Sequence, residues 1–326
     1  MLKKPKSINS LMKYMRDEKK IDINGSTEKK KLRYMGYYHG YKGYRYHFSP
    51  SNLYNFSSFT EIQAVYDYDM ALKTMFYPEI MFLETALKNY VLEEVLETVN
   101  SKRFADVYAQ VLTSYKKFHI GTDGYKKEIK KRMNVRNNIY KLISRDYEKR
   151  NVVKHYYDKD QPIPIWAIFE LMSLGDFGSF ISCTDENIKH KIASSIGIKK
   201  SFDTDGMMTQ RIVYALKDLR NSVAHNNTIF DTRFKTGNIH NNISKYISSE
   251  TGINNIKFDS IIDYVVLICF IMNLLECPKT RMNNILRAFE NINETLRKQV
   301  PISIYNTIVH TDARNKIEKM KEYIKQ

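Results

Sequence analysis

The scarcity of helix-breaking residues limits most strongly what this chain can fold into. Only 7 prolines and 12 glycines occur in 326 residues, and long segments between them repeat apolar residues at helical spacing. The clearest such run spans 59–99, where the period is near 3.6 residues. Pro78 falls inside this run and predicts a turn or kink. The sequence therefore predicts an all-α protein.

Further helices are expected along the whole chain. Their predicted ranges are 103–117, 125–148, 162–183, 185–196, 258–276, 279–298 and 309–325, together with one beginning near Met207. Asp203 or Asp205 can cap the helix at Met207. Gly175 and Gly178 predict an interruption of the 162–183 helix or a close approach of another backbone.

The remaining segments define the expected organisation. The polar, Asn-rich segment 226–256 is typical of a loop, and Tyr41–Phe48 is the one candidate strand. We expect one compact unit with three parts: a basic, Tyr-rich N-terminal lobe (1–58), a helical core (59–276) and C-terminal helices (277–326).

The formal net charge of +16 favours polyanionic partners, which are nucleic acids or anionic membranes. A membrane is the weaker prediction, because the longest apolar run, Ile261–Leu275, contains Asp263 and is shorter than the ~20 residues of a spanning helix. It is expected to be a buried core helix. No signal peptide is recognised at the N-terminus.

Cysteine usage and the absence of nucleotide or metal motifs narrow the function further. The three cysteines are widely spaced and form no C-x-x-C pair, which is typical of a reducing, cytoplasmic setting without disulfides or zinc. No phosphate-binding glycine motif and no metal-ligand spacing occurs. We expect no cofactor and no metal site.

The segment R-N-S-V-A-H (220–225) is the strongest functional signal. On a helical wheel of 207–226, one stripe is apolar and the opposite stripe is polar and ends at His225. Arg220 lies on the flank between them. The apolar stripe holds Met208, Ile212, Ala215, Leu216, Leu219 and Val223, and the polar one holds Tyr214, Asp218, Asn221 and His225.

This combination of residue types suits cleavage of RNA without a metal. Histidine titrates near neutral pH and can move the proton of a ribose 2′-hydroxyl or of the leaving oxygen. Arginine stays charged and can stabilise the phosphorane, while Asn221 can position the phosphate or the imidazole. One histidine does not readily serve as both base and acid, so we expect a homodimer with a composite site.

Two carboxylates on apolar helices, Glu84 and Glu170, need partners. Arg220 can pair with either of them, whereas an ordinary i,i+4 pair of Glu84 with Lys88 is the equally acceptable alternative. We assign Glu84, Glu170, Asp218 and Tyr214 as supporting residues of the Arg220–His225 site.

Two further segments are candidates for RNA contact. In 28–48 aromatics alternate with cations and glycines, as in proteins that stack unpaired bases, and 126–141 is strongly basic. The candidates are Tyr37, Tyr38, Tyr41, Lys42, Tyr44 and Arg45 in the first, and Lys130, Lys131, Arg132 and Arg136 in the second. Packing of the tyrosines on the core and a solvated helix face are the respective alternatives.

Four segments together resemble a known group. R-N-S-V-A-H is similar to the R-x(4–6)-H signature of HEPN domains. Three others resemble the Abi-like abortive-infection proteins of the AbiD/AbiF group: Y-M-G-Y-Y-H-G-Y-K-G-Y (34–44), the helix pair at 65–90, and P-I-P-I-W-A-I-F-E-L-M-S-L-G-D-F-G-S-F (162–180). They cover roughly 30–230. Lys88 and His39 stand where the family pattern has arginine.

The resemblance implies an all-α HEPN-like bundle with metal-independent endoribonuclease activity in phage defence. Arg220 and His225 would be the catalytic pair, with Asn221 as accessory, and a small structured non-coding RNA would be a possible regulator. The main alternative is a non-catalytic HEPN protein that binds such an RNA. A HEPN antitoxin for a nucleotidyltransferase is a third reading, which no residue here supports.

Overall fold

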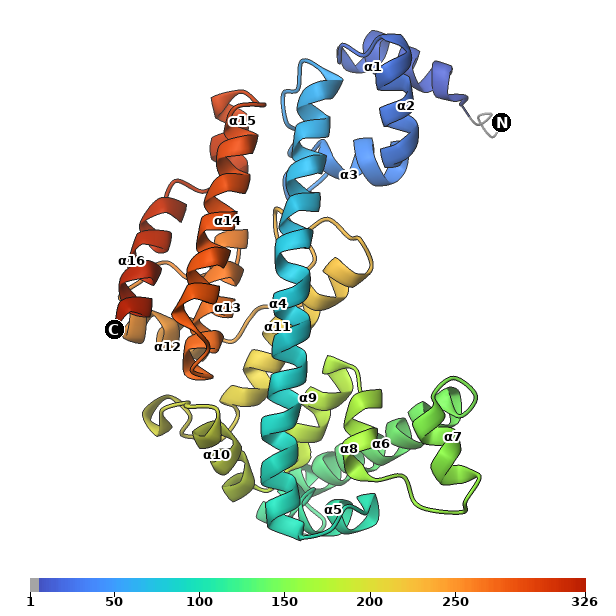
Figure 1. Ribbon diagram of the computed structural model, residues 1–326, viewed down its shortest axis with the longest axis vertical. Helices are drawn as coiled ribbons and strands as arrows, with labels where there is room; N and C mark the ends of the chain where they lie inside the picture. The colour runs from blue at the N-terminus through green and yellow to red at the C-terminus, as the bar shows by residue number, and fades with distance from the viewer. Residues whose placement is uncertain (1–5) are drawn as a thin grey trace.

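The computed structural model describes residues 6–326, and within them the fold is all-α, with only isolated backbone bridges outside the helices. Helix α4 (Phe59–Val99) forms the long axis of the molecule (Figure 1). At 1.5 Å per residue its 41 residues span about 60 Å. A capping box of Ser58 and Glu61 begins the helix. The predicted turn at Pro78 is wrong, because α4 continues through it.

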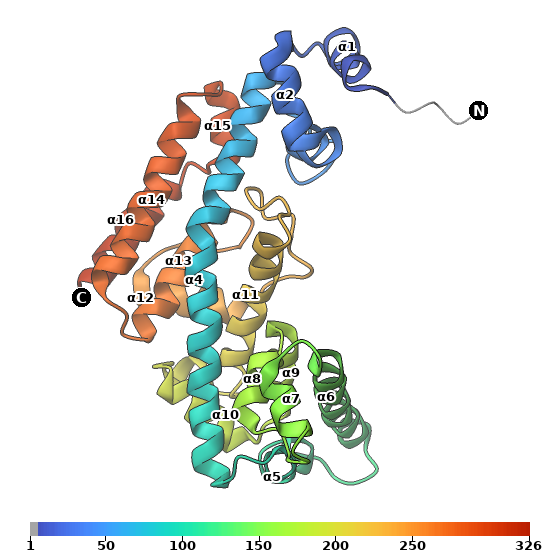
Figure 2. The ribbon, with the colours of Figure 1, turned by 45° about the vertical axis from the view of Figure 1, so that its right-hand side comes forward.

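The N-terminal lobe packs at one end of α4 (Figure 2). It contains α1 (Ile8–Lys19), α2 (Gly25–Met35), a π-helical turn (Gly36–Tyr41) and α3 (Lys42–Tyr44). The candidate strand at Tyr41–Phe48 is therefore wrong. Tyr41 and Tyr44, three residues apart, are both buried, which is the spacing of one helix face rather than of a strand.

Six helices surround the opposite end of α4 (Figure 1). They are α5 (Phe104–Gln110), α6 (Asp123–Asp146), α7 (Asn151–Tyr157), α8 (Ile165–Leu171), α9 (Leu174–Cys183) and α10 (Glu186–Ser195). The expected 162–183 helix breaks at Ser173, which caps α9 with Asp176, and not at Gly175. Gly178 permits the close approach of a side chain rather than of another backbone, because a Cβ there would lie 2.8 Å from the Tyr214 ring.

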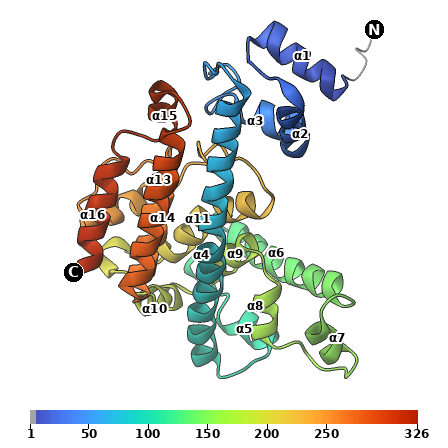
Figure 3. The ribbon, with the colours of Figure 1, turned by 45° about the horizontal axis from the view of Figure 1, so that its top comes forward.

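The remaining helices cover another side of α4 (Figures 2 and 3). Helix α11 (Met208–Ala224) packs against α4 and α9. It is followed by α12 (Asn241–Thr251), α13 (Ile261–Leu274), α14 (Lys279–Arg297), α15 (Ile302–Ile308) and α16 (Ala313–Lys325). Helix α13 is the buried core helix expected from its composition. No helix among residues 6–326 has the length and apolarity to cross a membrane.

Helix α12 corrects the expected loop at 226–256. Its buried residues, Ile243, Tyr246 and Ile247, lie three and four positions apart, and Tyr246 stacks on Phe202 at 4.6 Å between ring centroids. The Asn- and Ser-rich surroundings hide this short apolar stripe. Packing of the stripe, rather than the helix propensity of Asn and Ser, stabilises α12.

Candidate active site

Helix α11 presents the two faces that its sequence predicts. Its apolar stripe is buried at five of the six predicted positions, with Val223 half-buried. Tyr214, Asp218 and Asn221 are half-buried, and His225 is exposed. The helix therefore turns its polar edge, ending at His225, toward solvent.

Two aspartates hold the start of α11, as predicted. Met208 donates its backbone N–H to Asp203 Oδ1 at 2.7 Å, and Asp205 accepts from the Met207 N–H and pairs with Arg211 at 2.6 Å. Burial raises the pKa of Asp203, although the hydrogen bond from the Met208 N–H and the nearby His190 both act to lower it. Burial also acts on Asp205, but its hydrogen bonds with Arg211 and backbone N–H groups outweigh it and lower the pKa.

The end of α11 places His225. The Asn227 N–H donates to Ser222 O at 2.8 Å and the Asn226 N–H to Val223 O at 3.3 Å, with Asn226 at φ 55°. This is a Schellman ending with His225 as the C-cap residue. The backbone at the imidazole is thus fixed by local hydrogen bonds, whereas the side chain projects from the surface.

Arg220 is held from the side by α4. Its Nε donates to Glu84 Oε2 at 3.0 Å, and Lys88 Nζ donates to the other carboxylate oxygen at 3.0 Å and to Met172 O at 2.7 Å. Glu84 and Lys88 are buried. Within residues 6–326 the terminal guanidinium nitrogens of Arg220 make no hydrogen bond. The Glu84 partner therefore orients the guanidinium and leaves its outer edge available to an anion.

A second acid–lysine pair on α4, Asp69 with Lys73, holds the chain immediately after His225. Asp69 Oδ1 accepts the backbone N–H groups of Ile229 and Phe230, each at 2.8 Å, and Lys73 Nζ donates to Asn226 Oδ1 at 2.8 Å. The two side chains pair with each other at 2.7 Å. Sequence reasoning missed both residues. Their four-residue spacing on an apolar helix, the same as that of Glu84 and Lys88, was the available signal.

The other supporting residues divide into two groups. Arg220 pairs with Glu84 and not with Glu170, which is exposed and forms no ion pair among residues 6–326, so the partner expected for Glu170 is absent there. Asp218 accepts both the N–H and the hydroxyl of Thr236, and Tyr214 lies within 3.2 Å of the Ser179 hydroxyl. These contacts join α11 to its neighbours.

The Tyr-rich candidates separate by burial. Tyr41 and Tyr44 are buried, and Tyr44 donates its hydroxyl to Asp69 at 2.7 Å, so both are core residues and cannot stack on RNA. Arg45 lies against the Tyr41 ring at 5.7 Å. Tyr38 is 77% exposed, and Lys42 lies 4.5 Å from its ring centroid. Tyr38 is exposed, and the half-buried Tyr37 and Lys42 lie beside it as the rest of this aromatic and cationic group.

The basic candidates on α6 separate in the same way. Lys130 and Lys131 are exposed, although Lys131 pairs with Glu128. Arg132 stacks on the Tyr108 ring at 3.8 Å and donates to Tyr108 O at 2.6 Å, which makes it a packing residue. The Arg136 guanidinium lies over the same ring, 5.4 Å from its centroid. Among residues 6–326 no group of three or more His, Cys, Asp or Glu could hold a metal ion.

A family model described as Abi-like protein matches residues 30–231. No curated protein and no solved structure matches the chain. The match covers more than half of the chain and includes the π-helical turn, α4, α8, α9 and all of α11 with His225. The chain belongs to the Abi-like protein family.

Proposed function

We propose that this protein is a metal-independent endoribonuclease of the abortive-infection type, with Arg220 and His225 at its reacting centre. The family itself is associated with abortive infection, a form of phage defence. The observation that supports the site best is the end of α11, where Glu84 orients Arg220 and His225 is exposed at the C-cap.

The chemistry follows from these two groups. An imidazole removes the proton of a ribose 2′-hydroxyl, whose oxygen attacks the adjacent phosphorus. The guanidinium of Arg220 binds the phosphorane oxygens as their negative charge grows. The P–O5′ bond breaks and the leaving oxygen takes a proton. The products are a 2′,3′-cyclic phosphate and a 5′-hydroxyl end, and no bond change requires a metal ion.

Base and acid are needed together in this scheme. Two chains that place their α11 ends face to face would supply one histidine for each role and two arginines for the phosphate. The exposure of His225 supports this arrangement, because neighbouring side chains do not enclose it. We therefore propose a homodimer as the active form.

One observation favours a second candidate function. The Nε of Arg220 donates to the buried Glu84, and this contact joins α11 to α4, which is a structural role rather than a catalytic one. If this is its only role, the protein binds a small structured RNA without cleaving it. The exposed Tyr38 and the half-buried Lys42 beside it supply RNA-contacting groups in either case.

Cleavage in EDTA separates the two functions. We expect the purified wild-type chain to cleave RNA with a chelator present and to leave cyclic phosphate ends. The Arg220→Ala/His225→Ala double variant should lose cleavage by at least ~100-fold and still bind RNA. His119→Ala, which removes an exposed histidine far along the chain, is the matched control. Wild-type binding without cleavage would support the second function, and cleavage by the double variant would overturn the first.

A further inference from the structure

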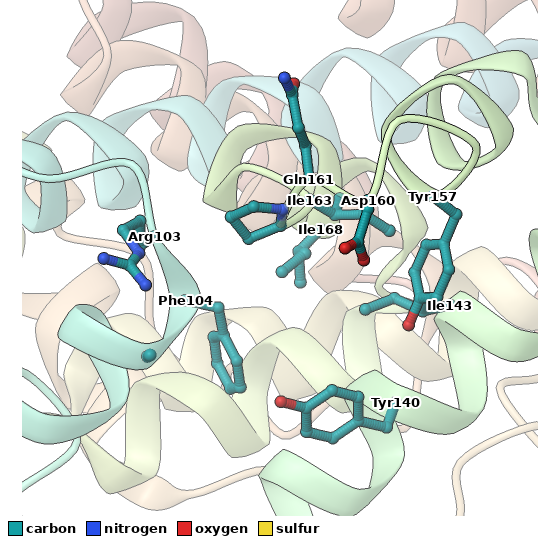
Figure 4. A pocket seen from close by; sticks show the side chains of 11 residues that line it. Arg103, Phe104, Tyr140, Ile143, Tyr157, Asp160, Gln161, Ile163 and Ile168 are labelled. Atoms are coloured by element: carbon teal, nitrogen blue, oxygen red, sulfur yellow. The ribbon is translucent and has the colours of Figure 1, made fainter.

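A pocket lies away from α11, between α5, α6, α7 and the segment that enters α8 (Figure 4). Asp160–Ile163 form part of its lining, and the last two of these residues begin the P-I-P-I-W segment (162–166). The proposed reaction assigns no role to this segment. Its volume is about 300 Å³. This is at the small end of the ~300–1,000 Å³ range of small-molecule sites, a size suited to one planar heterocycle.

The pocket has a rigid apolar floor. Phe104, Ile143, Ile163 and Ile168 are all buried. The segment is fastened to the start of α5, because the Ile165 N–H donates to Lys102 O at 2.8 Å and Arg103 bridges Pro164. The floor therefore needs no rearrangement before a ligand enters.

Two half-exposed aromatic rings line its walls. Tyr140 and Tyr157 come from α6 and α7 and are 54% and 51% exposed. The Phe104 ring meets Tyr140 edge to face at 6.3 Å. In Figure 4 the hydroxyl ends of both tyrosines point toward the cavity. Half-exposed rings around an apolar floor are the arrangement that stacks unpaired bases in RNA-binding proteins.

Two charged groups face each other across this cavity. Figure 4 shows the Arg103 guanidinium on one side and the Asp160 carboxylate on the other, whereas the Gln161 amide turns away. Within residues 6–326 neither Arg103 nor Asp160 forms a salt bridge. An ionised carboxylate only accepts hydrogen bonds. Guanine is the RNA base with two adjacent donors, N1–H and N2–H, on its Watson–Crick edge, and it matches both carboxylate oxygens.

We propose that this pocket binds an unpaired guanine of an RNA strand. Tyr140 and Tyr157 contact the faces and edge of the base, Asp160 accepts from its Watson–Crick edge, and Arg103 binds the adjoining phosphate. The inference rests on the proposed function in taking RNA as the ligand. It adds a base-specific anchor outside the Arg220–His225 site.

Binding of defined oligonucleotides tests the inference. The probe is a fluorescein-labelled octauridine with one central guanine, compared with its adenine-centred and all-uridine forms. Anisotropy is measured at one fixed salt concentration on the full-length His225→Ala chain, so that cleavage does not consume the probe. We expect the guanine probe to bind about 10-fold more tightly than the other two, roughly the scale of one hydrogen bond to a charged group.

Variants assign the preference to the pocket. Asp160→Asn should abolish the guanine preference, and Tyr157→Ala should weaken guanine binding about 5-fold or more without affecting the all-uridine probe. Asp123→Asn makes the same charge change at an exposed carboxylate, at the start of α6 and away from the pocket residue Tyr140. This variant should preserve the preference. Melting temperatures confirm that each variant folds.

The failures of the two proposals are distinguishable. Equal affinity for all three probes, or a preference that survives Asp160→Asn, would overturn the guanine pocket while wild-type cleavage in EDTA continued. A wild-type chain that never cleaves but prefers the guanine probe would overturn the endoribonuclease and leave the pocket standing.

Discussion

At the scale of single residues, the fold holds Arg220 and His225 in different ways. Arg220 depends on a side chain from another helix, Glu84, whose second oxygen is already bound by Lys88. His225 depends on the backbone of its own helix end. Removing Glu84 should therefore disturb both stability and Arg220, whereas changes at the exposed His225 should act on chemistry alone.

Glu84→Gln tests this dependence. The change leaves the charge of buried Lys88, and part of that of Arg220, without a counter-charge. We expect a loss of about 3 kcal/mol in the free energy of unfolding and a fall in RNA cleavage, measured by urea unfolding and by initial rates. Glu170→Gln removes an exposed carboxylate that forms no ion pair within the described part of the chain, residues 6–326, and should stay within about 0.5 kcal/mol of wild type. Similar losses in both variants would count against a specific role for Glu84.

At the scale of the element, α11 is bounded by local devices at both ends. Asp203 and Asp205 accept backbone N–H groups at its start, and the Schellman turn through Asn226 ends it. The pKa values of the two aspartates shift in opposite directions. Burial raises the pKa of Asp203, whose Oδ2 is buried and has no hydrogen-bond partner among residues 6–326. Arg211 and backbone donors outweigh burial at Asp205 and lower its pKa.

Because the two pKa shifts are opposite, the contributions of the two aspartates to the free energy of unfolding should change with pH in opposite directions. With a raised folded pKa, Asp203 contributes stability below its ordinary value of 3.8, and this contribution is lost as pH rises through the folded pKa. Asp203→Asn should therefore be at least as stable as wild type at pH 7. As pH falls toward about 4, the free energy of unfolding of wild type should rise relative to that of the variant.

Asp205→Asn is the matched control at the same helix start. Its lowered folded pKa gives stability that is present at neutral pH and lost as pH falls. This variant should be less stable than wild type at pH 7, with a deficit that shrinks in acid. Urea unfolding from about pH 3 to pH 7 measures both differences, because the Asp205 contribution is lost only as pH falls below the ordinary carboxyl pKa of 3.8. Slopes of the same sign would refute the assignment.

At the scale of the whole molecule, α4 connects the N-terminal lobe to the site. Tyr44 of the lobe and the loop after His225 share the carboxylate of Asp69. A second connection lies beside it: Asp231 accepts the Phe48 N–H and pairs with Arg233, which donates to Gly43 O and Tyr46 O. The lobe is therefore joined to the chain that follows the proposed catalytic histidine.

Arg233→Ala should loosen this junction. It leaves the buried Asp231 without its counter-charge, and we expect a cost of about 3 kcal/mol with faster hydrogen exchange at the amides of 43–48. Cleavage should fall although Arg220 and His225 are intact. Arg281→Ala breaks a comparable pair with Glu79, between α14 and α4, and should leave exchange at 43–48 unchanged. Unchanged exchange in Arg233→Ala would show that the lobe is held by other contacts.

The sequence by itself determined what depends on neighbouring residues: the all-α class, the two faces of α11, its aspartate caps and the core character of α13. Each follows from a period of 3.6 residues or a cap within one turn. It also predicted Arg220 with Glu84 as one of several pairings.

Only the tertiary structure decided the rest. In the folded chain α4 continues through Pro78, and Tyr41 and Tyr44 are buried. Asp69 accepts the backbone N–H groups of Ile229 and Phe230, some 160 positions away. The tertiary structure also selected Glu84 over Glu170 as the partner of Arg220. These outcomes depend on which helix faces meet, and packing between distant segments is not encoded in the spacing of any one of them.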